Sequence, residues 1–249
     1  MKVNILINRL YNEECFECMK RIEDKTVDMV LCDLPYGITK NDWDKPLDIQ
    51  KLWSEYDRIC KDNAVIVLTA VNPFSAQLIA SNIKNFKYDL VWEKTAATNH
   101  LNAKRMPLRS HENILIFYKK PGTYNPQKTF GHKPTNKYTK NQNDGTNYGK
   151  TKIGISGGGS TERYPRSVLK FSSDKQKCSI HPTQKPLALF EWLIKTYSNE
   201  NDLILDNCSG SATTAVACLK NNRNFICIEK DAYYHKKASE RIKNLEDEI

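Results

Sequence analysis

The chain contains the stretch Asp33-Leu34-Pro35-Tyr36-Gly37 directly after a largely apolar run, Val27 to Cys32. A run of this kind, bounded by turn residues, is typical of a buried β-strand. The proline and the glycine predict that the chain leaves the sheet at this point. An acid, a proline and an aromatic residue therefore follow the carboxyl end of a strand, which is the edge where open α/β sheets bind ligands.

These residues have the chemistry to hold a planar heterocycle that carries an amino group. The Asp33 carboxylate accepts a hydrogen bond from an amine, and the Leu34 carbonyl, stiffened by the proline after it, accepts a second. Tyr36 offers a flat face for stacking. The alternative interpretation is a strand that ends in a turn, with the aspartate accepting hydrogen bonds from its own backbone.

A second stretch, far along the chain, predicts a site for a nucleotide-like cofactor. It runs from Asp206 to Thr214, after the apolar residues Leu203 to Leu205 and before an alanine-rich helical pattern. In a strand, loop and helix of this kind, small side chains let the backbone approach the cofactor closely. Glu229 ends the next predicted strand, about 20 residues later, where an acid accepts hydrogen bonds from ribose hydroxyls.

Three motifs resemble the signatures of the DNA amino-methyltransferases. Asp33-Leu34-Pro35-Tyr36 is similar to their Asp-Pro-Pro-Tyr motif, and Asp206 to Ala212 is similar to their Asp-x-Phe-x-Gly-x-Gly loop, which binds S-adenosylmethionine. His181-Pro182-Thr183-Gln184-Lys185-Pro186 matches a third signature, which packs beside the methionine end of that cofactor. The catalytic motif precedes the cofactor loop, as in the β class of the family.

The chain departs from these signatures at Leu34, Cys208 and Ala212. Leu34 replaces a proline, which matters little because its backbone carbonyl is the implied acceptor. Cys208 replaces the phenylalanine of the cofactor loop. Ala212 replaces the last glycine of that loop and leaves slightly less room, so we expect it to affect cofactor affinity.

The resemblance implies a set of site residues around S-adenosylmethionine, which leaves as S-adenosylhomocysteine, and it implies no metal. Glu14 stands where the family has an acid that reaches the adenine amino group of the cofactor; the alternative is a solvent-exposed glutamate near a helix start. The implied catalytic residues are Asp33, Leu34, Pro35 and Tyr36. The implied cofactor-binding residues are Glu14, Asp33, His181, Thr183, Lys185, Asp206, Cys208, Gly210, Ser211, Thr213 and Glu229.

Alternating strand and helix patterns predict a doubly wound α/β sheet with helices on both faces. The resemblance adds that this Rossmann-like sheet is mostly parallel, with about seven strands and an antiparallel edge strand. Residues 1–118 are then the catalytic half and residues 181–249 the cofactor-binding half. Between them, residues 119–180 lose apolar periodicity and are rich in Lys, Asn, Thr, Tyr and Gly. We interpret this segment as an inserted target-recognition segment.

Two polar loops are predicted on the substrate side. Residues 38–46 follow the catalytic turn and are in a position to close over the substrate. Residues 94–110 follow a predicted strand from Tyr88 to Trp92. Arg105 and Arg109 in the second loop either contact phosphate or are simply solvated.

The composition favours a soluble protein with a polyanionic partner. In 249 residues the formal charge is +9 and the sequence pI is about 9.0, which suits double-stranded DNA. No apolar stretch approaches the roughly 20 residues of a membrane span. Eight cysteines without a signal peptide indicate a reducing compartment, so we expect a cytoplasmic location. Cys15 and Cys18 have CxxC spacing, but no second pair with zinc spacing accompanies them.

The resemblance implies site-specific methylation of the exocyclic amino group of a flipped adenine in DNA. Asp33 favours adenine over the cytosine amino group, because serine is commoner here in the cytosine enzymes, but both substrates stay open. A catalytically silent DNA-binding protein on this fold is a further alternative. An NAD-dependent dehydrogenase is disfavoured because the strict GxGxxG spacing is absent. A homodimer and a cognate restriction enzyme are further partners consistent with the family.

Overall fold

The computed structural model describes residues 5–37, 44–140, 153–173, 180 and 184–247. The chain divides into two compact units, one of residues 1–125 with 167–249 and one of residues 126–166. The second unit lies inside the segment 119–180 that the sequence marks as an insertion. It begins later in the sequence and ends earlier than that segment.

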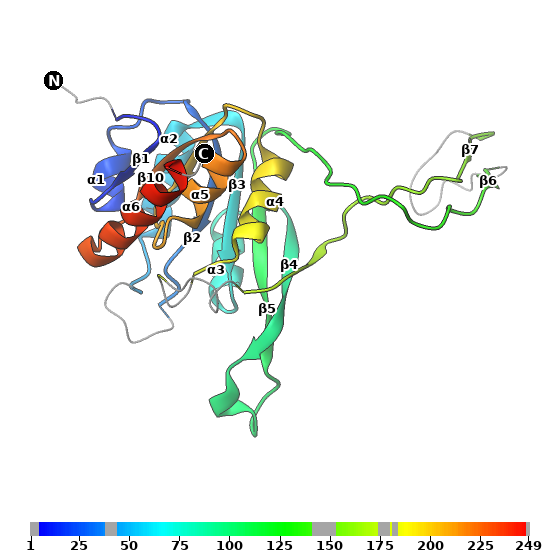
Figure 1. Ribbon diagram of the computed structural model, residues 1–249, viewed down its shortest axis with the longest axis horizontal. Coiled ribbons are helices and arrows are strands. Elements are labelled where there is room, and N and C mark those ends of the chain that lie inside the picture. The colour runs from blue at the N-terminus through cyan, green and yellow to red at the C-terminus, as the bar shows by residue number, and fades with distance from the viewer. Residues whose placement is uncertain (1–4, 38–43, 141–152, 174–179, 181–183, 248–249) are drawn as a thin grey trace. The chain divides into compact units, whose positions relative to one another are not determined.

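An eight-stranded sheet forms the centre of the first unit (Figure 1). All neighbouring strands pair in parallel except around β5, which is antiparallel to β3 and to β4. The mostly parallel α/β sheet is therefore confirmed, with one strand more than expected. In sheet order the strands are β1 (Arg9–Tyr11), β10 (Asn224–Ile228), β9 (Leu203–Asp206), β2 (Val27–Asp33), β3 (Cys60–Ala70), β5 (Arg109–Phe117), β4 (Phe86–Thr98) and β8 (Val168–Phe171).

The antiparallel strand β5 does not lie at the edge, where it was expected, because it pairs with β3 on one side and with β4 on the other. β8 comes from within the segment 119–180 and pairs in parallel with β4, from Val91 opposite Val168 to Lys94 opposite Phe171. It therefore covers the edge that β4 would otherwise expose.

Helices cover both faces of the sheet, as in a doubly wound fold. One face packs against α1 (Cys15–Met19), α2 (Ile49–Ile59) and α3 (Phe74–Ser81), and the other against α4 (Leu187–Tyr197), α5 (Thr213–Lys220) and α6 (Ala232–Glu246). Successive residues of β2 supply both cores, because the side chains of a strand alternate between its faces. Val30 and Cys32 belong to the first core, whereas Met29 and Leu31 belong to the second. Among the described residues, no helix has the length and apolar character needed to cross a membrane.

The β4–β5 hairpin continues beyond the sheet as an arm, which we define as residues 95–111 (Figure 1). The two strands pair as far as Thr98 opposite Arg109, and a short 3-10 helix, His100–Asn102, forms part of the tip. The predicted polar loop at 94–110 is therefore wrong in its first and last residues, which are paired strand. The run Thr95-Ala96-Ala97-Thr98 carries no apolar alternation, so its pairing had no signal in the sequence.

The second unit consists of extended chain without helix in its described residues, 126–140 and 153–166. Thr129 forms an antiparallel bridge with Arg163, and β6 (Tyr138–Thr139) pairs with β7 (Ser156–Gly157). Lys128 and Glu162 form an ion pair of 2.8 Å across the same ladder. Phe130 and Tyr164 are exposed on it, at 71% and 68%.

Candidate active site

A cavity of about 790 Å³ lies at the carboxyl edge of the parallel strands in the first unit. Strands β2 and β9 end there at Asp33 and Asp206, and Glu229 directly follows β10, because parallel strands in register bring their carboxyl ends together. Twelve residues that the sequence analysis assigned to the site line this cavity: Glu14, Asp33, Leu34, Pro35, Tyr36, Lys185, Asp206, Cys208, Gly210, Ser211, Thr213 and Glu229. His181, Thr183 and most of the loop 38–46 lie outside the described residues.

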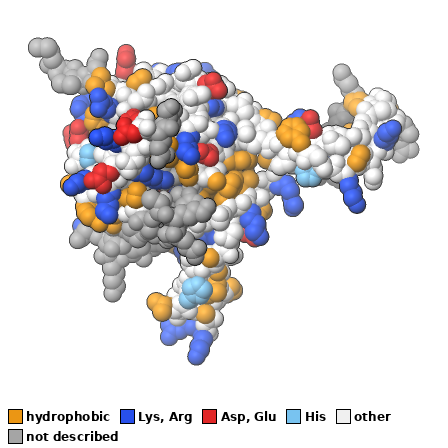
Figure 2. Space-filling model, in the orientation of Figure 1, with side chains coloured by type: hydrophobic (Ala, Val, Ile, Leu, Met, Phe, Trp, Pro, Cys, Tyr) orange, Lys and Arg blue, Asp and Glu red, His pale blue; other side chains and the backbone are white. Residues whose placement is uncertain are grey.

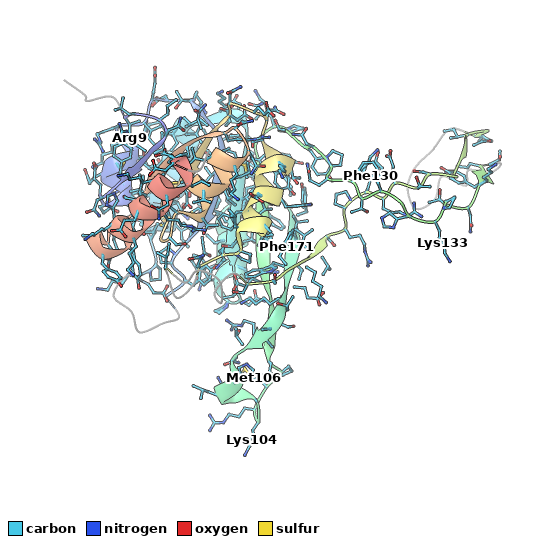
Figure 3. All side chains as sticks on the ribbon, viewed as in Figure 1. Arg9, Lys104, Met106, Phe130, Lys133 and Phe171 are labelled. Carbon is cyan, nitrogen blue, oxygen red and sulfur yellow. The ribbon has the colours of Figure 1, made fainter. Side chains whose placement is uncertain are left out.

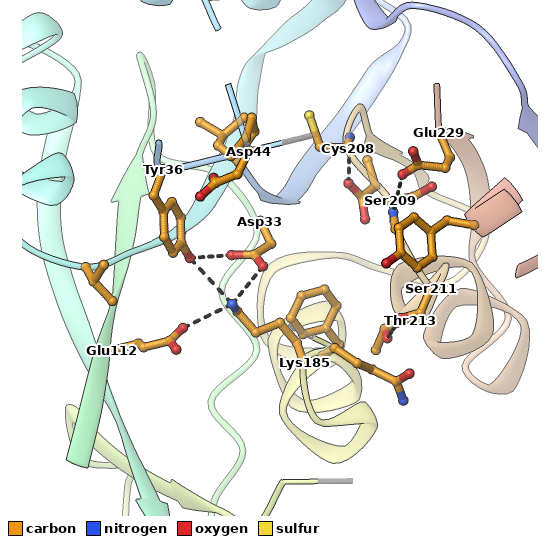
Figure 4. A pocket seen from close by; sticks show the side chains of 18 of the residues that line it. Asp33, Tyr36, Asp44, Glu112, Lys185, Cys208, Ser209, Ser211, Thr213 and Glu229 are labelled. Atoms are coloured by element: carbon orange, nitrogen blue, oxygen red, sulfur yellow. Dashed lines mark hydrogen bonds and ion pairs between the residues drawn. The ribbon is translucent and has the colours of Figure 1, made fainter. Parts of the chain in front are cut away.

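Asp33 accepts three hydrogen bonds, of which Figure 4 shows those from Tyr36 and Lys185. The hydroxyls of Tyr36 and Thr69 both donate to its Oδ1, and the Lys185 ammonium contacts Oδ2 at 2.7 Å. A carboxylate offers about four lone-pair positions. Among the described groups, three are used, and the remaining position is on Oδ2, the oxygen that Lys185 holds.

Lys185 lies between two carboxylates, those of Asp33 and Glu112 (Figure 4). Its Nζ is 3.1 Å from Glu112 Oε2, and Lys94 contacts the other oxygen of Glu112 at 2.5 Å. The side chains of Lys185 and Glu112 are 7% and 10% exposed, so this four-residue charge cluster is largely shielded from water. Two acids and two bases make the cluster neutral, which is how buried charges are tolerated.

The protonation states of the cluster follow from its geometry. Burial lowers the pKa of Lys185, but the carboxylates of Asp33 and Glu112 outweigh it and raise that pKa well above its ordinary value. Burial likewise raises the pKa of Glu112, and the two lysine ammonium groups outweigh it, so the pKa ends below its usual range. Burial and the neighbouring Asp33 charge raise the pKa of Tyr36, so its hydroxyl keeps its proton and donates. Lys185 and Glu112 are therefore both ionised near neutral pH.

The turn after Tyr36 is held by specific contacts. Gly37 has a φ of 69°, and a Cβ at this position would lie 2.6 Å from Pro46 Cγ. Its N–H donates to Asp44 Oδ1 at 2.9 Å, and Asp44 is buried. Only a glycine meets both the left-handed conformation and the close approach, so the last residue of the opening stretch fixes the direction in which the chain leaves β2.

The cofactor side of the cavity is built from the loop after β9 and the end of β10. Glu229 accepts from the Gly210 N–H at 2.9 Å (Figure 4) and from the Asp231 N–H at 2.8 Å, so its carboxylate bridges the two segments. Burial raises the pKa of Glu229, and these backbone donors oppose that shift. Burial raises the pKa of Asp206 to about 7, although Thr214 and the Cys208 N–H donate to it.

Ala212 has a φ of 54° and is fully buried, and it is not among the residues that line the cavity. The expectation that Ala212 affects cofactor affinity stays a prediction. The replacement of glycine at this left-handed position costs backbone strain of about 1 kcal/mol.

Glu14 caps a helix and also lies at the cavity, while its contact with cofactor stays a prediction. It is the N-cap of α1, where its Oε2 accepts from the Glu17 N–H at 3.0 Å, and it also lines the cavity. The Cys15 thiol donates to the other oxygen of Glu14 at 3.3 Å. The cap holds the Glu14 carboxylate at the cavity wall, in reach of a ligand amino group.

Sequence reasoning missed Thr69, Glu112, Lys94 and the contact that Lys185 makes. Thr69 lies near the end of β3 opposite Asp33, a pairing that only the sheet register reveals. Glu112 lies on β5, 73 residues before Lys185, and no local pattern links the two. The one available signal was the position of Glu112, an acid just before the apolar run Ile114 to Phe117. Gln184 is a further site residue that the sequence analysis did not assign. Its Nε2 is buried at the cavity without a partner among the described residues.

Comparisons with known proteins agree in one family. A family model described as DNA methylase matches residues 27–240. The chain is 30% identical to the Type II methyltransferase M1.MboII of Moraxella bovis, over 96% of this chain and 98% of that protein. It is 29% identical to the DNA adenine methyltransferase YhdJ of Escherichia coli (strain K12), over 90% of this chain and 79% of that protein. Among solved structures, the M1.HpyAVI–SAM complex is similar with a TM-score of 0.64 and 25% identity, over 94% of this chain and 98% of that chain.

Proposed function

The chain belongs to the DNA methylase family and is an S-adenosylmethionine-dependent DNA methyltransferase, and we propose that its target is the exocyclic amino group of adenine. The observation that carries the proposal is the Asp33 carboxylate at the end of β2. It lies in a cavity that also holds the small-residue loop and Glu229. Tyr36, Thr69 and Lys185 orient this carboxylate and leave one acceptor position towards a ligand.

The residues around the cofactor loop fit S-adenosylmethionine. Gly210, with a φ of 50°, brings its backbone to the cavity wall. Glu229 keeps a further lone pair on each oxygen for the ribose hydroxyls, and Glu14 suits the adenine amino group. The buried Gln184 Nε2 has no acceptor among the described residues, and the carboxylate of the methionine part would supply one. When bound, this cofactor supplies an electrophilic methyl group on a positively charged sulfur.

The chain's own residues supply the geometry of the target amine. An exocyclic amine is a weak nucleophile because its lone pair is delocalised into the ring. With Asp33 accepting one N–H and the Leu34 carbonyl accepting the other, the nitrogen is held pyramidal and its lone pair is directed away from both acceptors. Asp33 is then the nearest base for the proton that the methylated nitrogen must lose. Alignment of this kind contributes much of the rate of such reactions.

Adenine is preferred over cytosine because an aspartate, not a serine, begins the motif, and the similarity to an adenine methyltransferase supports the choice. The base must leave the duplex to reach the cavity, and the half-buried ring of Tyr36 at the cavity wall is its stacking surface. The second unit, with its exposed Phe130 and Tyr164, is the part of the segment 119–180 that we assign to target recognition. We further propose that the chain forms a homodimer, acts alongside a cognate restriction enzyme and is located in the cytoplasm.

The test is methylation of DNA by the purified chain, with the methylated positions identified by sequencing and by mass spectrometry of the nucleosides. N6-methyladenine is the expected product, and N4-methylcytosine in its place would overturn the choice of base. Asp33→Ala should reduce turnover at least ~10²-fold, as for loss of a preorganised hydrogen-bonding group, while S-adenosylmethionine still binds. Asp57→Ala, at an exposed acid on α2, is the matched control and should turn over normally.

A further inference from the structure

The tip of the hairpin arm exposes several apolar side chains. Leu101 is fully exposed there, Met106 is 53% exposed and Leu108 is 37% exposed. Single exposed apolar residues are common on proteins, but three on one projecting turn form a cluster that marks an interaction surface. Figure 3 shows Lys104 and Met106 at the far end of the arm.

The tip is an ordered turn, so its apolar residues are presented in a defined way. Asn99 adopts a left-handed conformation with a φ of 73°, and its side chain accepts from Asn102 Nδ2 at 2.6 Å. The Met106 and Arg105 N–H groups both donate to the Asn102 carbonyl, at 3.0 and 2.8 Å. His100 closes the turn with a contact of 3.0 Å between its Nε2 and the Ala97 carbonyl. Leu101 is the side chain that this turn directs into solvent.

The charge of the arm specifies the partner. Residues 95–111 contain Lys104, Arg105 and Arg109 and no acid. Figure 2 shows Lys and Arg side chains gathered with hydrophobic ones at the end of the arm, without Asp or Glu. Cations around an apolar centre match a duplex, which offers phosphates outside and stacked bases inside.

The arm begins at the candidate active site. Its residues Thr95 to Thr98 and Arg109 line the cavity. Leu101 follows Thr98 by three residues, so their Cα atoms are no more than about 11 Å apart. That distance is about three base steps of 3.4 Å. A duplex that delivers one base to the cavity therefore has its neighbouring steps within reach of Leu101.

We propose that the arm binds duplex DNA, with Leu101 inserted into the base stack beside the extruded base and with Lys104 and Arg105 on the flanking phosphates. The inference rests on the proposed function, since it assumes that a base leaves the duplex. An extruded base leaves two faces of its former neighbours without stacking partners. An apolar wedge covers those faces and so favours the extruded state, as apolar side chains do in proteins that kink DNA. Met106 and Leu108 widen the apolar surface behind the wedge.

The test uses the full chain and a duplex oligonucleotide that contains the methylated site, with S-adenosylhomocysteine present. In the first experiment, 2-aminopurine replaces the target adenine and its fluorescence reports extrusion. Leu101→Ala should lower the extruded fraction about tenfold, given the apolar area it no longer buries, with the affinity for S-adenosylhomocysteine unchanged. Ile83→Ala, at an exposed isoleucine beyond α3, is the matched control and should behave as the wild type.

In the second experiment, binding of the same duplex is measured as a function of salt concentration. The Lys104→Gln/Arg105→Gln variant should flatten the dependence of log K on log salt by about 2, since each phosphate contact contributes about 0.9. Lys236→Gln/Lys243→Gln removes the same charge from the exposed face of α6 and should leave the slope unchanged.

Three outcomes would overturn the inference. Leu101→Ala with wild-type extrusion would show that the tip is not the wedge. Equal slopes for the two double variants would show that the arm does not contact phosphate. Sedimentation showing that Leu101→Ala dissociates a dimer, with extrusion intact, would assign the tip to a second copy of the chain. If the wild-type chain methylates no DNA, the proposed function fails instead, and that result is obtained before any arm variant is made.

Discussion

Replacing Lys185 by methionine separates two roles for the third motif, positioning of Asp33 and binding of cofactor. The substitution keeps most of the side-chain volume and removes the ammonium that lies 2.7 Å from Asp33 and 3.1 Å from Glu112. Two unit charges about 4 Å apart attract by about 4 kcal/mol at an effective dielectric constant near 20. Removing one partner of such a buried pair typically costs 3–5 kcal/mol of stability, roughly.

We expect Lys185→Met to lower the free energy of unfolding by about 3 kcal/mol and turnover by about 10²-fold. The loss of turnover follows because Asp33 keeps two hydroxyl donors on Oδ1 and loses the donor that orients Oδ2. The affinity for S-adenosylmethionine, measured by titration calorimetry, should change little. Lys195→Met, at an exposed lysine of α4, is the control for the substitution itself.

A second variant keeps the prediction testable if the first folds poorly. Lys185→Met/Glu112→Gln removes one charge of each sign, so the cluster is neutral again and stability should recover by about 1–3 kcal/mol. Turnover should stay low, because Asp33 still lacks its ammonium partner. Wild-type turnover in either variant would refute positioning of Asp33 by Lys185. Selective loss of cofactor affinity would instead show that Lys185 binds cofactor.

Three further predictions concern the cofactor side and the recognition segment. Glu229→Ala and Gly210→Val should each weaken S-adenosylmethionine binding at least ~10-fold by calorimetry, whereas Gly131→Val, at a positive-φ glycine with open space around it, should not; unchanged affinity in both would disprove the placement. The pKa of Asp206 is raised from 3.8 to about 7, so the folded state prefers the protonated acid and stability falls as pH rises from 4 to 7. Asp206→Asn should therefore gain up to about 4 kcal/mol relative to wild type at pH 8 and nothing at pH 4, in thermal unfolding. Replacing residues 119–180 by the segment of a related enzyme should move methylation to the donor's site; a chimera that folds and keeps the original site places recognition elsewhere.

The sequence predicted best what local pattern determines. Apolar runs with turn residues located β2 and β9, and helical periodicity located α4 at Leu187–Tyr197. The motifs placed Asp33, Gly210 and Glu229 at one cavity, because parallel strands share a carboxyl edge.

The contacts that depend on tertiary structure were not predictable in this way. Lys185 was assigned to cofactor by resemblance alone, and its contact with Glu112 joins two segments that share no pattern. β8 was hidden in a segment whose composition is polar, since four residues at a sheet edge need no long apolar run. The same holds for the base of the arm, where threonine and alanine form strand only because the partner strand is already there.

The pairing of β1 with β10 has a consequence for how this architecture tolerates rearrangement. The first strand and the last lie side by side in parallel, and α6 follows β10 back along the sheet towards the edge where β1 begins. A peptide linker from the end of α6 to the start of β1 would therefore bridge one side of the first unit. New ends opened within residues 126–166 would fall between the two halves of the sheet's sequence. Such a circular permutant would carry the cofactor loop before the catalytic turn and keep every strand neighbour. In this fold the order of the motifs along the sequence depends on where the two chain ends lie. The arrangement of the site in space does not depend on that order.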